Sequence, residues 1–342
     1  MRRTRVLAAS VAAVAATGIA LAVPHGAQAD TAKQSAVTTV GVHNTYTKDA
    51  YAYLAQALDA GTSMIELDVW VDITSGQFKV SHDNPLGNDN NCVVATDPSQ
   101  LYTGLRDRNL ENCLDDVRVW YDAHPGHAPL TIKIEMKAGF EDNDGLGPDE
   151  LDALIKAHLG SKVFKPADLK GSYPSLDAAA QADNWPTRDA LAGKVMFEII
   201  PGTVEQNNPF DDYWTDEEEA TYLKNLNAAG HLANAQVFPS VLKATAGDPR
   251  TRYDSSLRPY FVFFDGDAAT YVSSVDTSFY RTHHYQLIMT DAQNVPPAIS
   301  ATTPTVAQAT ARVQQLAADN ASIVSSDWRT LTTVLPMVLP RG

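Results

Sequence analysis

Two acidic side chains lie where they could bind a metal ion together. Glu66 and Asp68 are two residues apart in an apolar, β-branched stretch, residues 64–71, that predicts a buried strand. Because side chains alternate between the two faces of a strand, both carboxylates point to the same side. Two buried carboxylates are costly unless a positive charge neutralises them. A divalent cation would do so, and the alternative is an ion-pair network with Lys133 or Lys137.

Further oxygen ligands for such a cation come from two other predicted strands. Asn44 directly follows His43 at the end of the first apolar stretch, and Glu135 lies near the end of the third. Together with Glu66 and Asp68, these residues offer one amide oxygen and three carboxylates. An all-oxygen set of this kind suits a hard cation such as Ca²⁺ or Mg²⁺ rather than zinc.

Two histidines could assist chemistry beside this cation. His43 ends the first stretch, and His82 lies in a short predicted strand over residues 77–83, which Gly76 turns back toward the preceding strand. One imidazole could protonate a leaving oxygen while the other stabilises charge on phosphorus. With Lys137 nearby as an anion-binding group, these residue types favour phosphodiester transfer.

The hydrophobic pattern predicts a fold in which the ends of strands that are distant in the sequence come together. Eight apolar, β-branched stretches predict strands, at residues 37–43, 64–71, 130–137, 194–200, 236–242, 260–265, 286–291 and 322–327. Helical patterns occur between several of them, at residues 49–60, 148–159, 215–229 and 305–318, with capping residues Thr47, Asp149, Thr215 and Thr305. Alternating strands and helices predict parallel strands, and eight such units predict a closed (β/α)₈ TIM-type barrel.

The strand ends support this fold, although Pro239 interrupts the fifth predicted strand. An open doubly wound sheet is the alternative, but it calls for a glycine-rich first turn that residues 41–44 lack. Barrel enzymes place their chemistry at the carboxyl ends of the strands, and further acidic residues on the predicted strands are Glu198, Asp265, Asp291 and Asp327. The polar, glycine-rich residues 139–147 predict a mobile loop over the mouth, and their acids do not match EF-hand spacing.

The N-terminus predicts export from the cell. Residues 1–29 combine a basic start, an alanine-rich apolar run and a small-x-small end, which are the parts of a cleaved secretory signal; a membrane anchor is the alternative. Residues 30–342 are then expected to form one catalytic domain, secreted and monomeric, without a transmembrane segment. The net charge of −15 argues against nucleic acid as a partner and against bulk attachment to anionic lipid.

The chain has two cysteines, Cys92 and Cys113. In an exported protein, a pair of cysteines predicts one disulfide bond. Two buried free thiols are the alternative, and neither cysteine has the spacing of a metal site.

Four short motifs resemble a known family. Residues 41–46 (GVHNTY), 65–69 (IELDV), 80–82 (VSH) and 134–137 (IEMK) are similar to the calcium-dependent phosphoinositide-specific phospholipases C, in particular to their secreted actinobacterial branch. The resemblance implies a barrel of the phospholipase C-like phosphodiesterase fold. By position, it implies that His43 and His82 are catalytic, that one Ca²⁺ is bound by Asn44, Glu66, Asp68 and Glu135, and that Lys137 binds the phosphate or headgroup.

The implied activity is the cleavage of phosphatidylinositol-type lipids at a membrane surface. The products would be diacylglycerol and a cyclic or open inositol phosphate. Two alternatives stay open: a phosphodiesterase of the same superfamily that acts on glycerophosphodiesters or sphingolipids, and a non-catalytic barrel that binds lipid or sugar.

Overall fold

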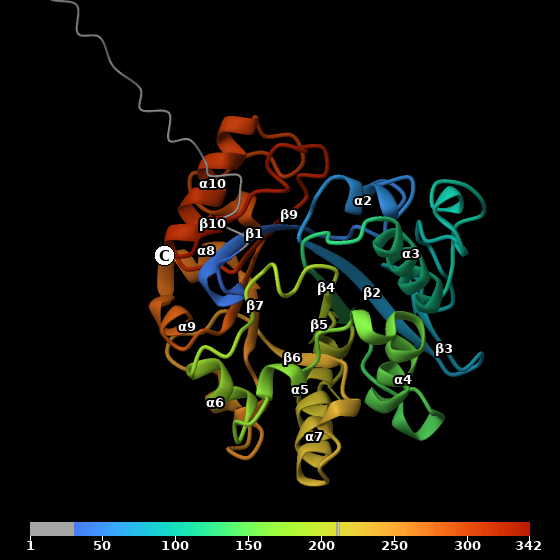
Figure 1. Ribbon diagram of the computed structural model, residues 1–342, viewed down its shortest axis with the longest axis horizontal. Helices are drawn as coiled ribbons and strands as arrows, with labels where there is room; N and C mark the ends of the chain where they lie inside the picture. Colours follow the sequence, from blue (N-terminus) through green and yellow to red (C-terminus); the bar gives the residue numbers. More distant parts are fainter. Residues whose placement is uncertain (1–30, 210, 212) are drawn as a thin grey trace, which may run out of the picture.

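A closed barrel of eight parallel strands, surrounded by helices, forms the protein (Figure 1). This computed structural model describes residues 31–209, 211 and 213–342, so the predicted signal peptide over residues 1–29 lies outside the described part. The barrel strands are β1 (Val37–Val42), β2 (Met64–Asp72), β4 (Leu130–Met136), β5 (Val195–Pro201), β6 (Val237–Leu242), β7 (Phe263–Asp267), β8 (Gln286–Thr290) and β9 (Ile323–Ser326). Because β1 pairs with both β9 and β2, the ring closes, which rules out the open sheet.

All eight predicted strands are confirmed, including the one that Pro239 interrupts. Pro239 lacks a backbone N–H, yet β6 keeps its register with β5 on one side and with β7 on the other. The strands are buried on both faces, as their nearly continuous apolar sequences require.

Two short antiparallel strands extend the barrel. β3 (Gln77–Val80) pairs with the end of β2 through a turn in which Gly76 has a φ of 65°. The prediction that Gly76 returns the chain is therefore confirmed. β10 (Leu339–Pro340), near the C-terminus, pairs with β1, the first strand of the barrel.

The helices agree with the prediction in part. They are α2 (Ala55–Asp59), α3 (Leu110–Ala123), α4 (Pro148–Leu159), α5 (Pro166–Lys170), α6 (Leu176–Gln181), α7 (Thr215–Ala228), α8 (Ala268–Ser274), α9 (Ser278–Thr282) and α10 (Val306–Ala318). Thr305 caps α10 as predicted, since its Oγ1 accepts the N–H of Gln308 at 3.2 Å. The helix expected over residues 49–60 is wrong in extent, because turns occupy its first half and only α2 forms.

Three predicted helix caps are also wrong. The N-cap of α2 is Leu54 rather than Thr47, because the helix begins only at Ala55. The N-cap of α4 is Gly147 rather than Asp149, because Pro148 occupies the first helical position, where its fixed φ suits the turn. The N-cap of α7 is Trp214, and Thr215 is already helical. Thr215 instead donates its backbone N–H to the buried carboxylate of Glu205 at 2.6 Å.

A disulfide bond joins Cys92 to Cys113, with their Cα atoms 5.0 Å apart. The predicted pairing is therefore present. Both residues are buried, and the bond ties the loop that follows β3 to the first turn of α3. α3 has no counterpart among the predicted helices.

The loop over residues 139–147 is anchored at both ends. Phe140 and Leu146 are buried, while the acidic residues between them are exposed and form a single 3₁₀ turn, Asp142–Asp144. Elsewhere, apolar side chains fill the space between the strands and the surrounding helices. None of the helices in the described part of the chain is long and apolar enough to cross a membrane.

Candidate active site

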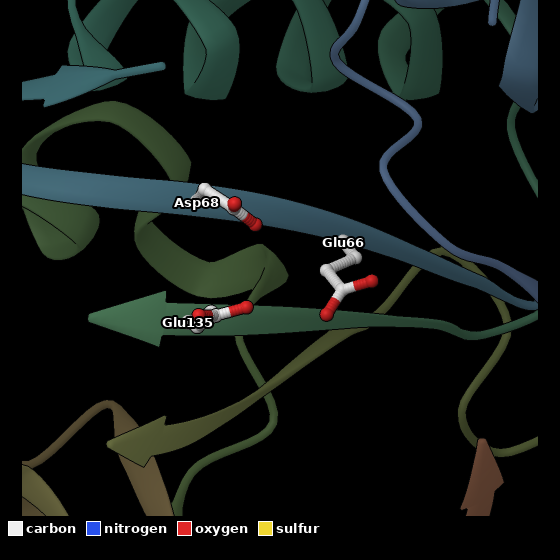
Figure 2. A group of neighbouring side chains, drawn as sticks. All are labelled: Glu66, Asp68 and Glu135. Atoms are coloured by element: carbon white, nitrogen blue, oxygen red, sulfur yellow. The ribbon is translucent and has the colours of Figure 1, made fainter. Parts of the chain in front are cut away.

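Three carboxylates meet at the carboxyl ends of two neighbouring strands. Glu66 and Asp68 come from β2, and Glu135 comes from β4 (Figure 2). The parallel register sets Asp68 beside Glu135, so the alternation of each strand turns all three toward the barrel interior. One oxygen from each carboxylate lies within 4.8 Å of the others, close enough for a shared metal ion.

Asn44 borders this cluster from the end of β1. Its backbone is left-handed, with a φ of 51°, and its N–H donates to Oε2 of Glu66 at 3.2 Å. Its side-chain Oδ1 is buried and has no hydrogen-bond partner among the described residues, and the same is true of Oδ1 of Asp68. Buried acceptors without a partner carry a desolvation cost, which a bound cation would remove. The amide and carboxylate oxygens of this cluster are therefore suitable ligands for a hard cation such as calcium.

Two buried lysines neutralise part of the acidic charge. Lys133 Nζ lies 3.1 Å from Oε1 of Glu66 and 2.9 Å from Oδ2 of Asp265. Lys137 Nζ lies 3.1 Å from Oδ2 of Asp68 and 2.9 Å from Oε1 of Glu135. The ion-pair network that was the alternative to a metal site thus exists, and it leaves the unpaired oxygens of Asn44 and Asp68 beside it.

The carboxylates of the cluster differ in acidity. Burial raises the pKa of Asp68 to about 7, and the negative charges of Glu135 and Glu66 add to the effect. For Glu66, burial opposes ionisation, but the positive charges of Lys133 and His43 outweigh it and lower its pKa. A pair of nearby carboxyl groups with unequal proton affinity is typical of catalytic sites.

His43 lies between two carboxylates. Its Nδ1 is 3.1 Å from Oδ1 of Asp327, and its Nε2 is 3.6 Å from Oε2 of Glu66. The charge of Glu66 raises the pKa of His43 to about 9, against the effect of burial and with the help of Asp327. The cationic imidazolium is therefore favoured at neutral pH. Asp327 immediately follows β9, whose pairing with β1 brings it next to His43.

His82 lies apart from this cluster, in the loop after β3. Its imidazole is 51 % exposed, and Nδ1 is 2.6 Å from Oδ1 of the neighbouring Asp83. The backbone N–H of Ser81 donates to the carbonyl of Asp68 at 3.2 Å, so the chain returns beside the cluster just before His82. No hydrogen bond or ion pair joins His82 to the other predicted site residues in the described part of the chain.

A cavity of about 270 Å³ opens at the mouth, next to the cluster. On the side of the carboxylate cluster it is lined by His43, Glu66, Lys133 and Glu135. The other lining residues come from the connections and strands beyond β4, namely Ile200, Pro201, Thr203, Gln206, Leu242, Asp265, Thr290 and Asp291. Asp265, Asp291 and Asp327 are acidic residues of the predicted strands to which the sequence assigns no role. In the structure, Asp265 and Asp291 line the cavity and Asp327 pairs with His43.

This fold and site define a barrel enzyme whose reaction centre lies at the carboxyl ends of its strands. A model of the family described as phosphoinositide phospholipase C, Ca²⁺-dependent, matches residues 25–225. The chain therefore belongs to the calcium-dependent phosphoinositide phospholipase C family.

Solved structures agree with this assignment. A Ca²⁺-dependent phosphatidylinositol-specific phospholipase C from Streptomyces antibioticus is 54 % identical, with 91 % of this chain and 99 % of that chain covered and a TM-score of 0.89. A calcium-dependent phosphoinositol-specific phospholipase C from a Gram-negative Pseudomonas species shares the fold, at 21 % identity, coverage of 92 % and 96 %, and a TM-score of 0.64. A comparison with curated proteins finds no similar sequence.

Proposed function

We propose that this enzyme cleaves phosphatidylinositol to diacylglycerol and a cyclic inositol phosphate, with one bound calcium ion. The observation that carries this proposal is the pair of unpartnered buried oxygens, on Asn44 and Asp68, beside a cationic His43 at the barrel mouth. Glycerophosphodiesters and sphingolipids are the alternative substrates within the superfamily.

Four residues are proposed to hold the ion: Asn44, Glu66, Asp68 and Glu135. When bound there, calcium would supply positive charge that favours ionisation of a nearby hydroxyl and binding of the substrate phosphate. The neutralising role of Lys133 and Lys137 agrees with this, since they pair with carboxylate oxygens and leave two acceptors for the ion.

The reaction is proposed to begin within the headgroup itself. Glu66 or Glu135 takes the proton of the inositol 2-hydroxyl, and that oxygen forms a new bond to phosphorus. The bond from phosphorus to the glycerol oxygen breaks, and His82 donates the proton that this oxygen needs to leave as diacylglycerol. Because the attacking hydroxyl and the phosphate belong to one molecule, their proximity lowers the barrier.

Two positive side chains are proposed to stabilise the phosphate during this step. His43, held as an imidazolium between Glu66 and Asp327, faces the cavity and would balance charge on the phosphate oxygens. Lys137 is proposed to act on the phosphate or headgroup as well, from a buried position between Asp68 and Glu135.

The protein is proposed to be exported with cleavage after Ala29 and to act as a monomer on phospholipid surfaces. The disulfide bond between Cys92 and Cys113 supports an oxidising compartment. Mass spectrometry of the protein recovered from the culture medium would test this, since an N-terminus at Asp30 is expected.

A product assay tests the activity. The protein is incubated with phosphatidylinositol, a glycerophosphodiester or sphingomyelin, each with calcium or with a chelator. Diacylglycerol and a cyclic inositol phosphate should form from phosphatidylinositol in the presence of calcium only. Faster release from either of the other two substrates would favour the alternative instead, and turnover of none would favour a non-catalytic barrel.

A further inference from the structure

A second pocket lies beside the reaction cavity, at the same end of the barrel. Its volume is about 470 Å³, within the range of small-molecule sites. The connections that follow β5 and β6 form it together with the first turn of α7. Leu242 lines the reaction cavity and the next residue, Lys243, lines this pocket, so the two hollows are neighbours. No residue of the carboxylate cluster lines the second pocket in the described part of the chain.

An indole ring forms part of the pocket wall. Trp214 directly precedes α7 and is only partly buried. Nζ of Lys243 lies 5.3 Å from the centroid of the Trp214 ring, within the range of cation–π attraction. The backbone of Lys243 is left-handed, with a φ of 75°, which is uncommon for a lysine. The pocket therefore offers a ligand an apolar ring face with an ammonium group beside it.

Polar groups of both kinds in this wall have hydrogen-bonding capacity left. The carboxylate of Glu217 is partly buried and makes no hydrogen bond or ion pair with the described residues. Asp216 is 1 % exposed, and its Oδ1 is buried without a partner among the described residues. Its Oδ2 is already engaged, by the hydroxyl of Tyr253 and by Nη2 of Arg252 at 3.5 Å. The ammonium group of Lys243 forms no ion pair within the described part of the chain.

This combination selects a ligand that both donates and accepts hydrogen bonds. Carboxylates only accept, whereas ammonium and guanidinium groups only donate. An anion such as phosphate would meet the carboxylates of Asp211, Asp216 and Glu217, and a cationic ligand would meet Lys243 and Arg252. A hydroxyl group does both. Neighbouring hydroxyls around a ring that also has an apolar C–H face are the features of a hexose.

We propose that the second pocket binds a neutral hexose, with its C–H face on Trp214, one hydroxyl donating to Glu217 and another accepting from Lys243. Two sources present this chemistry: a hexose attached to the inositol ring of the lipid, and a separate glycan. Because the pocket contains no residue of the proposed reaction centre, binding of the sugar does not depend on the proposed function.

Saturation-transfer NMR titrations with methyl α-mannoside and with methyl β-glucoside test the site on the calcium-loaded protein. At least one glycoside should bind the wild type. Trp214→Ala should raise its Kd by about tenfold or more, as expected when an aromatic anchor is removed. Glu217→Gln should weaken binding by a smaller factor, because it keeps the shape but replaces a charged acceptor with a neutral one. Trp214→Phe keeps an aromatic face and should retain most of the binding, which separates loss of the ring from loss of the fold.

Tyr102→Ala is the matched control. It also removes a partly exposed aromatic ring, one that is 38 % exposed and whose hydroxyl donates to Asp59 at 2.9 Å. Tyr102 lies between β3 and α3 and does not line the pocket, so its removal should leave glycoside binding at the wild-type value.

A second measurement distinguishes the two sources of the sugar. It compares kcat/KM for phosphatidylinositol with kcat/KM for a derivative mannosylated on the inositol 6-hydroxyl, which leaves the 2-hydroxyl free. If the lipid carries the hexose, Trp214→Ala should lower the rate on the mannosylated lipid by about tenfold relative to phosphatidylinositol. If the hexose belongs to a separate glycan, the ratio should be the same in both proteins while the glycoside still binds.

Absence of binding of both glycosides to the wild type would overturn the inference. So would equal binding by Trp214→Ala, or binding of inorganic phosphate or choline at this pocket in place of the glycosides. Failure to cleave phosphatidylinositol, with glycoside binding intact, would overturn the proposed function and leave this site in place.

Discussion

The roles proposed for the two histidines can be distinguished with a substrate whose leaving group needs no protonation. His82→Ala should reduce turnover of phosphatidylinositol by about 10²–10⁴, the usual contribution of a positioned proton donor. The aryl oxide of an aryl inositol phosphate leaves readily without protonation, so the His82 variant should recover much of its loss on that substrate.

His43→Ala is the comparison for this experiment. Charge on the phosphate has to be balanced whatever group leaves, so this variant should remain impaired on the aryl substrate. Steady-state rates of both variants on both substrates are the measurement. Equal losses for the two variants on both substrates would contradict the division of roles.

Asp327 is expected to act on substrate only through His43, as a positioning residue, because its Oδ1 lies 3.1 Å from Nδ1 of His43. Asp327→Asn should lower kcat by about 10- to 100-fold, the range found when a partner that orients a functional group is removed. Calcium affinity should change little, because Asp327 is not a proposed ligand. Calorimetry with calcium and kcat on phosphatidylinositol provide the two readouts, and a large loss of calcium binding would contradict the proposed role.

At the level of elements, a buried aspartate joins α3 to the loop that contains Cys92. This aspartate should make the free energy of unfolding depend on pH. Asp116 on α3 accepts the N–H of Val93 at 2.7 Å. Burial raises the pKa of Asp116 to about 8, although the backbone N–H groups that it accepts oppose the shift. The folded protein therefore binds this proton more tightly than the unfolded chain does, whose carboxyl has a pKa near 3.8.

The stabilisation from this proton is complete below about pH 4 and is lost as the pH rises toward about 8. Asp116→Asn keeps an acceptor for Val93 without the titrating proton. Thermal unfolding at pH 5 and pH 8 should show a smaller drop in Tm for this variant than for the wild type. An identical pH dependence in both proteins would show that Asp116 does not titrate in this way.

The elements also show what the sequence could predict. The barrel strands are long apolar runs, so their pattern alone identifies them. Glu66, Asp68 and Glu135 could be grouped because strand alternation fixes the direction in which their side chains point. The helix predicted at residues 49–60 is too long, because turns occupy the first half of this range.

Contacts across the barrel closure were harder to predict. The pairing of His43 with Asp327 joins residues 284 positions apart, and it depends on β1 lying beside β9. The position of Asp291 in the cavity wall likewise follows from ring closure, because β8 lies opposite β4 across the barrel. A single sequence gives strand ends, but not which ends face each other.

For the molecule as a whole, the net charge is strongly negative: −15 for the full sequence, and more negative once the arginines of the predicted signal peptide are removed. This charge should govern how the protein approaches a membrane. An acidic protein is repelled by anionic lipid, and salt screens that repulsion. Initial rates on phosphatidylinositol vesicles should therefore stay constant or rise as the salt concentration increases from about 0.05 to 0.5 M. A steep fall in rate with salt would indicate a basic membrane-binding surface instead.

The central claim is that four oxygen-bearing residues at the barrel mouth hold one calcium ion that turnover requires. Calcium titration by calorimetry, with turnover of phosphatidylinositol followed over the same concentrations, tests it most directly. The wild type should bind one ion, with rates that follow occupancy, while Asp68→Asn should bind calcium much more weakly and Asp144→Asn should match the wild type. Unchanged calcium binding in Asp68→Asn, or full activity in the presence of a chelator, would contradict the claim.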